Sequence, residues 1–146
     1  MDNILVAIDF SDITQKVITQ GMLMARAFDC KLWLIHIAAP DPDFVGYSTG
    51  PQFRRDLRSK TLHDEHKYLQ NQADALRKQN IDVTTLLIQG EIVESILQEA
   101  LKLKADRIII GSHGHGALYK TLMGSVSEGV IRRAPCPVTI VPAQTT

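Results

Sequence analysis

The sequence predicts an α/β protein with a doubly wound parallel sheet, and two observations carry this prediction. Short runs of Val, Ile and Leu alternate with longer amphipathic segments in the order βαβαβαβαβ. These runs are apolar at nearly every position, as is typical of parallel strands covered by helices on both faces. With 146 residues, the chain has the length of one domain. We therefore expect one Rossmann-like domain over residues 1–146, with five strands in the order 3-2-1-4-5.

The first elements follow directly from the pattern. Ile4 begins a short β-rich run that ends at Ile8, and apolar residues then recur at helical spacing, which predicts a helix with Ser11 or Asp12 as its N-cap. Another apolar run ends near His36, and a long segment with an intermittent apolar stripe precedes the third run. The predicted elements are strand 4–8, helix 12–28, strand 32–37, helix 54–79 and strand 81–88.

Residues 39–53 interrupt this alternation, because they contain three prolines and two glycines. Such a composition predicts a long loop, and a long loop in a compact domain is often a lid or a binding loop.

The second half repeats the alternation. Gly90 and Glu91 open an amphipathic helix with acidic residues in its first turn and lysines in its last, which suits the helix dipole. A fourth apolar run ends at Gly111, and a glycine-rich stretch leads to a last helix and strand. The predicted elements are helix 90–104, strand 107–110, helix 125–134 and strand 137–141.

Composition excludes several classes of protein. Lysines and arginines equal aspartates and glutamates, so the formal net charge is zero, which argues against a nucleic-acid partner. No run approaches the roughly 18–20 apolar residues that span a bilayer, and the first residues do not form a signal peptide, so we expect no membrane partner and a cytoplasmic location. Cys30 and Cys136 lack zinc-site spacing and are expected to be reduced, mostly buried thiols.

The segment after the fourth strand carries the strongest functional pattern. Two residues separate Gly111 from Gly114, and nine residues separate Gly114 from Gly124-Ser125, where a helix begins. Glycines allow backbone N–H groups to approach phosphate oxygens closely, and a helix N-terminus attracts anions. Strand-to-helix turns also use Gly and Ser for purely structural reasons, so the pattern alone leaves both interpretations open.

Asp9 ends the first strand, which is central in the expected sheet. Its carboxylate can accept ribose hydroxyls or help to hold Mg²⁺ through a phosphate, or it can simply complete a turn or cap a helix. His113 and His115 form an HxH pair, but a metal site needs further ligands that the sequence does not identify, so no protein metal site is expected. His36 is expected to be a satisfied core or rim residue, and His63 and His66 to be exposed.

On the basis of these residues and motifs, the chain resembles the universal stress protein family over essentially its whole length. The pattern Gly111-x2-Gly114-x9-Gly124-Ser125 resembles the signature of the ATP-binding branch of that family, and ILVAIDFSD and GSVSEGVIRRAPCPVTIVP resemble its first and last segments. The resemblance implies a nucleotide site in which glycine-segment residues surround the triphosphate and ribose, Asp9 meets ribose or metal, and apolar residues line the adenine. The implied residues are Ala7, Asp9, Ile37, Ile110, Gly111, Ser112, His113, Gly114, Gly124, Ser125 and Val126.

The resemblance further implies ATP, with Mg²⁺, as the ligand and a homodimer formed through the last strand, residues 137–141. The expected function is that of a nucleotide-responsive stress or signalling regulator. A nucleotide-free dimeric interaction module and a slow ATP hydrolase remain the alternatives. A fast enzyme is not expected, because the chain has no GxxxxGK[ST] motif and no nucleophile–base constellation stands out.

Overall fold

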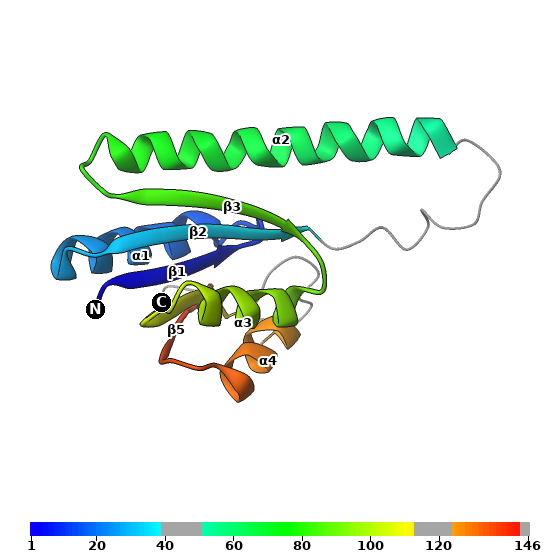
Figure 1. Ribbon diagram of the computed structural model, residues 1–146. Coiled ribbons are helices and arrows are strands. Elements are labelled where there is room, and N and C mark those ends of the chain that lie inside the picture. Colours follow the sequence, from blue (N-terminus) through cyan, green and yellow to red (C-terminus); the bar gives the residue numbers. More distant parts are fainter. Residues whose placement is uncertain (39–50, 113–123, 144–146) are drawn as a thin grey trace.

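The computed structural model describes residues 1–38, 51–112 and 124–143, with the side chains of the second range described from Lys60 onward. Strands and helices alternate along these residues as predicted (Figure 1). The elements are β1 (Asn3–Ile8), α1 (Thr14–Phe28), β2 (Lys31–Ala38), α2 (Pro51–Arg77), β3 (Val83–Gln89), α3 (Ile92–Lys102), β4 (Arg107–Gly111), α4 (Ser125–Arg133) and β5 (Val138–Val141).

The sheet has five parallel strands in the order β3-β2-β1-β4-β5, which confirms the predicted fold class and strand order. β1 is central, and its register pairs Ile8 with His36 of β2 and Val6 with Ile109 of β4. Because all strands run in one direction, their C-terminal ends meet at one edge of the sheet, which we call the carboxyl edge. β5 is an edge strand, as expected.

Helices cover both faces of the sheet, α1 and α2 one face and α3 and α4 the other (Figure 1). Side chains alternate along the strands, so Leu34 of β2 packs into the cluster under α1 and α2, whereas Ile35 packs into the cluster under α3 and α4. Gly21 lets α1 approach the sheet, because a Cβ there would lie 2.6 Å from Cγ2 of Val6. Burial of both faces explains the nearly continuous apolar runs.

Two predicted boundaries are wrong for physical reasons. The predicted loop 39–53 extends too far, because α2 begins at Pro51, and proline suits the first turn of a helix, where its missing N–H has no partner to lose. The rest of that loop, residues 39–50, lies outside the described residues. The predicted N-cap of the first helix is also wrong: α1 begins at Thr14 after Ile13, no side chain caps it, and Thr14 N–H donates to Ser11 O at 3.1 Å.

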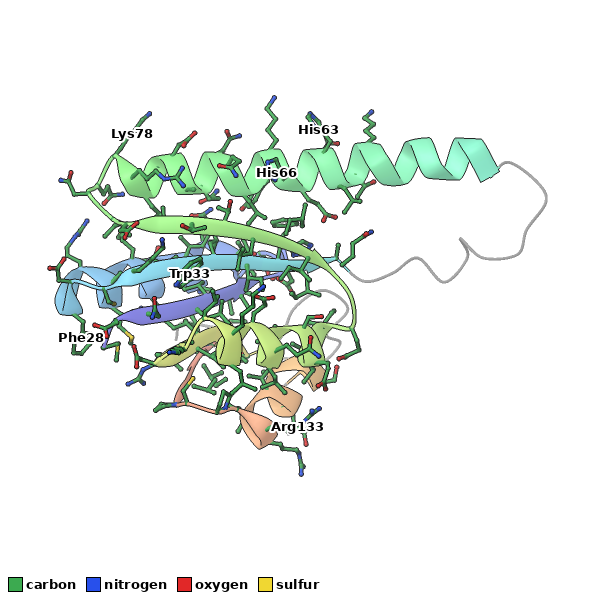
Figure 2. All side chains as sticks on the ribbon, in the orientation of Figure 1. Phe28, Trp33, His63, His66, Lys78 and Arg133 are labelled. Atoms are coloured by element: carbon green, nitrogen blue, oxygen red, sulfur yellow. The ribbon has the colours of Figure 1, made fainter. Side chains whose placement is uncertain are left out.

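Other boundaries differ from prediction by a residue or two, as is usual at frayed ends. In α3, Glu91 is the N-cap and its carboxylate accepts from the N–H groups of Val93 and Glu94, so the helix begins at Ile92 and not at Gly90. His63 and His66 are exposed on α2 as predicted, and Figure 2 shows His63 on its outer side.

At the opposite edge of the sheet, where the strands begin, one carboxylate connects two strands. Asp106 accepts hydrogen bonds from the backbone N–H of Asp2 at 2.6 Å and of Asn3 at 2.9 Å, and thereby joins the start of β1 to the start of β4. These two backbone bonds lower the pKa of Asp106, because they favour its charged form.

Cys30 is buried, Cys136 is half-buried, and both are free thiols, as expected. Burial raises the pKa of each thiol. Over the described part of the chain, no helix is long and apolar enough to cross a membrane.

Candidate functional site

The carboxyl edge brings together the described residues that the sequence singled out. Ala7, Ile37 and Ile110 lie near the ends of β1, β2 and β4, and all three belong to or pack against the apolar cluster under α3 and α4. Val126, in the first turn of α4, packs against the same cluster. All four residues belong to this cluster or pack against it near the carboxyl edge, and we call them the apolar wall.

The two ends of the glycine segment meet at this edge. Gly124 N–H donates to Ser112 O at 2.7 Å, so the chain returns to the end of β4 before α4 begins. Ser112 N–H in turn donates to Val141 O at 2.9 Å, which continues the ladder between β4 and β5. His113 and Gly114, which the sequence also predicts at the site, lie outside the described residues.

Ser127 is the residue at this junction that the sequence analysis missed. Its side chain is almost fully buried, and Oγ donates to Ser112 O at 2.8 Å and lies 2.9 Å from Gly124 O. The hydroxyl thus links Ser112, which follows β4, to Gly124, the N-cap of α4. Its position three residues after Gly124 is the available signal, because a serine hydroxyl in a helix can reach the carbonyl three residues before it.

The N-terminus of α4 is suited to bind an anion. Its N-cap is Gly124, which is extended and has no side chain to accept from the first-turn N–H groups. Ser125 follows with an exposed side chain. Unpaired amides, the positive end of the helix dipole and a hydroxyl are the groups that recognise phosphate.

Asp9 lies directly after β1 and is partly buried. One carboxylate oxygen, Oδ1, accepts from the N–H of Ser11 at 3.0 Å, which closes a turn over residues 9–11 that we call the Asp9 turn. The structure therefore shows Asp9 completing a turn, which is one of the alternatives that the sequence left open. A carboxylate has capacity for several hydrogen bonds, so this role does not exclude a ligand.

Two hydroxyls beside the Asp9 turn are unusual. Ser11 Oγ and Thr14 Oγ1 are both buried and have no hydrogen-bond partner among the described residues. Thr14 is 2% exposed and begins α1. Buried hydroxyls are normally paired, so these two can bond to a ligand or to a part of the chain that the structure does not describe.

His36 is a satisfied residue, as predicted. It is 8% exposed, and its Nδ1 lies 2.8 Å from Ile8 O across the β1–β2 ladder. Among residues 1–38, 60–112 and 124–143, no cluster of three His, Cys, Asp or Glu side chains could hold a metal ion. His113 and His115 fall outside those ranges.

Comparison with known proteins gives a consistent picture. The model of the universal stress protein family matches residues 1–142. A universal stress protein of Thermus aquaticus is 33% identical over 144 residues, covering 94% of this chain and 96% of that protein.

Solved structures share the fold. UspA of Lactobacillus plantarum has a TM-score of 0.77 at 23% identity and covers 96% of this chain and 97% of its own. The Archaeoglobus fulgidus protein in complex with dAMP has a TM-score of 0.68 at 22% identity, covering 96% and 97%. An Arabidopsis thaliana protein with AMP bound has a TM-score of 0.67 at 19% identity, covering 97% and 91%.

Proposed function

The chain belongs to the universal stress protein family, and we propose that it binds ATP at the carboxyl edge and acts as a nucleotide-responsive stress or signalling regulator. The observation that carries this proposal is the junction of Ser112 with Gly124. It fixes both ends of the glycine segment beside the uncapped N-terminus of α4, where backbone amides can surround phosphates.

The remaining residues support a nucleotide and not a bare anion. The apolar wall of Ala7, Ile37, Ile110 and Val126 suits an adenine ring, and the Asp9 carboxylate suits ribose hydroxyls. The two unpaired hydroxyls beside the Asp9 turn offer further donors. The full proposed set is Ala7, Asp9, Ile37, Ile110, Gly111, Ser112, His113, Gly114, Gly124, Ser125 and Val126.

Two fold relatives, from Archaeoglobus fulgidus and Arabidopsis thaliana, contain dAMP and AMP. They support an adenine ligand for this chain, and the glycine pattern supports the triphosphate. Mg²⁺ would accompany ATP, held mainly by phosphate oxygens with Asp9 as the protein carboxylate, and would neutralise phosphate charge.

We do not expect fast turnover. Phosphoryl transfer needs a cation to neutralise the transition state and a group that positions water. The sequence has no Walker lysine, and the candidate lysine in this region is Lys120, between Gly114 and Gly124. Slow ATP hydrolysis is the alternative activity, and a nucleotide-free interaction module is the alternative function.

Assembly follows from the exposed edge of the sheet. β5 is an edge strand, and its Val138 and Ile140 are only partly buried. Apolar edge strands tend to be paired or covered, so a homodimer through residues 137–141 is part of the proposal. We place this dimer, built from the single domain 1–146, in the cytoplasm, with no nucleic-acid or membrane partner.

The test is to purify the protein without added nucleotide, denature it and identify the released molecules by mass spectrometry. Near-stoichiometric ATP supports the proposal and slow turnover together. Stoichiometric ADP would instead favour the hydrolase. No released nucleotide, combined with no thermal shift on adding Mg-ATP, would favour the nucleotide-free module.

A further inference from the structure

His36 connects three elements at the carboxyl edge, and its contact with β1 indicates which ring nitrogen donates. Nδ1 lies 2.8 Å from Ile8 O, and a carbonyl oxygen can only accept a hydrogen bond. Nδ1 therefore carries a hydrogen and donates it to β1. The other ring nitrogen, Nε2, faces α2.

Glu65 of α2 meets that second nitrogen. Its Oε2 lies 3.2 Å from Nε2, and both side chains are largely buried, with exposed fractions of 18% for Glu65 and 11% for His36. Within the described residues, Oε2 makes no hydrogen bond that would hold it elsewhere. Its close approach to Nε2 therefore couples β2 to α2.

The ring of Phe10 lies on His36. The two ring centroids are 4.1 Å apart with an interplanar angle of 29°, and Tyr68 of α2 meets Phe10 edge-on at 4.7 Å. Phe10 is the central residue of the Asp9 turn and has φ 62°, in the left-handed region that non-glycine residues rarely adopt. Such a conformation persists only where surrounding contacts hold it, and the ring contacts with His36 and Tyr68 provide them.

We propose that His36 and Glu65 are positioning residues for the nucleotide site: through Phe10 they hold the Asp9 turn in the conformation that presents its carboxylate, and they link nucleotide occupancy to α2. Neither residue needs to touch the nucleotide. Because coupling is reciprocal, a ligand that orders the Asp9 turn also strengthens the contact between β2 and α2. This inference rests on the proposed nucleotide site.

The experiment compares three variants by calorimetric titration with ATP and with AMP. Glu65→Ala should weaken binding about five- to twentyfold, a usual size for coupling between linked sites. Glu65→Gln should bind like the wild type, because its side chain has the same shape and its amide N–H can donate to Nε2. Asp64→Asn, an exposed neighbour on the same helix, is the matched control and should not change the affinity.

A second readout needs no nucleotide. The N–H of Ser11 donates to Asp9 Oδ1, so its hydrogen exchange, followed by NMR in the free protein, reports on the Asp9 turn. Glu65→Ala should accelerate this exchange, and Glu65→Gln should not. If the wild type binds neither nucleotide, the proposed function fails while the exchange result still tests the positioning role. Unchanged Ser11 exchange in Glu65→Ala would overturn the inference, as would a Glu65→Gln variant that behaves like Glu65→Ala.

Discussion

The two halves of the carboxyl edge are fixed in different ways. On the β1–β2 side, side chains fix the Asp9 turn: the His36 ring bonds to the Ile8 carbonyl and contacts Glu65, and Phe10 stacks on it. On the β4–α4 side, a main-chain carbonyl joins the two ends of the glycine segment, because Ser112 O accepts from Gly124 N–H and also from Ser127 Oγ. The first half depends on residues distant in sequence, and the second on a local pattern.

This difference predicts how each half responds to substitution. A half held by main-chain bonds should be sensitive to added Cβ atoms and charges but tolerant of changes in exposed side chains. A half held by side-chain contacts should lose its geometry when one ring or one carboxylate is changed. The following predictions test this comparison, from the largest expected effect to the smallest.

Gly114→Asp should abolish nucleotide binding and leave the helical content intact. A carboxylate about 4 Å from a phosphate costs on the order of 4 kcal/mol at an effective dielectric constant of 20, so affinity should fall by at least about 100-fold. Titration with Mg-ATP and far-UV circular dichroism measure the two quantities. Gly116→Asp adds the same charge to the same segment, at a position that the glycine pattern leaves unspecified, and should bind far better than Gly114→Asp. Unchanged affinity in Gly114→Asp would remove the glycine segment from the site.

Ser127→Ala and Ser125→Ala should separate stability from binding at the start of α4. Ser127 is buried and bonds to the Ser112 carbonyl, so its loss should lower the free energy of unfolding by about 1–2 kcal/mol in urea titrations. Ser125 is exposed, so its loss should change stability by less than about 0.5 kcal/mol. Ser125→Ala should still weaken ATP binding by about tenfold, the effect of one hydrogen bond to a charged group. Equal stability of the two variants would contradict the proposed division.

Phe10→Leu should weaken the β1–β2 half without unfolding the protein. The substitution keeps an apolar side chain but removes the ring contacts with His36 and Tyr68, and aromatic pairs contribute about 0.5–1.5 kcal/mol beyond their burial. We expect a loss of about 1 kcal/mol in the free energy of unfolding, with faster exchange of the Ser11 amide. Phe28→Leu is the control, because Phe28 is exposed at the far end of α1. An equal effect of both changes would mean that the ring stack does not fix the turn.

Asp106→Asn should have the smallest effect and should spare the carboxyl edge entirely. The pKa of Asp106 is lowered in the folded protein, so its stabilising contribution is present above the ordinary carboxyl value of about 4 and is lost as pH falls through the lower folded value. The wild type should therefore be slightly more stable than Asp106→Asn at neutral pH, and the difference should vanish in acid. Urea titrations at several pH values measure it, with exposed Asp82→Asn as control. A change in ATP affinity would show that the two edges are not independent.

The sequence predicts the fold well because the determining signals are local. Apolar runs and helical spacing each extend over a few residues, and parallel order follows from their alternation. The Ser112–Gly124 junction could also be predicted from the sequence, because glycines at fixed spacing limit how the chain can turn. Glu65 and Tyr68 carry no such signal, since each is one polar or aromatic residue on a long helix. Their partners, His36 and Phe10, are fixed only when α2 packs on β2 and β3.

The wrong boundaries have similar causes. Ser11 and Asp12 are good capping types, but Ser11 uses its backbone groups in the turn. Its N–H donates to Asp9 and its carbonyl accepts from Thr14, so α1 starts two residues later than predicted. The composition groups Pro51 with the prolines of a loop, although proline is compatible with the first turn of a helix and α2 begins at Pro51.

The central position of β1 has a consequence for biosynthesis. β1 is made first, but its partner on one side, β4, follows about a hundred residues later, as the contact between Asn3 and Asp106 shows. During translation, β1, β2 and β3 can assemble with α1 and α2 while the other flank of β1 still lacks its neighbour. The nascent chain therefore passes through a stage with an open strand edge and an uncovered apolar face, which is the stage most prone to aggregation and most in need of a chaperone.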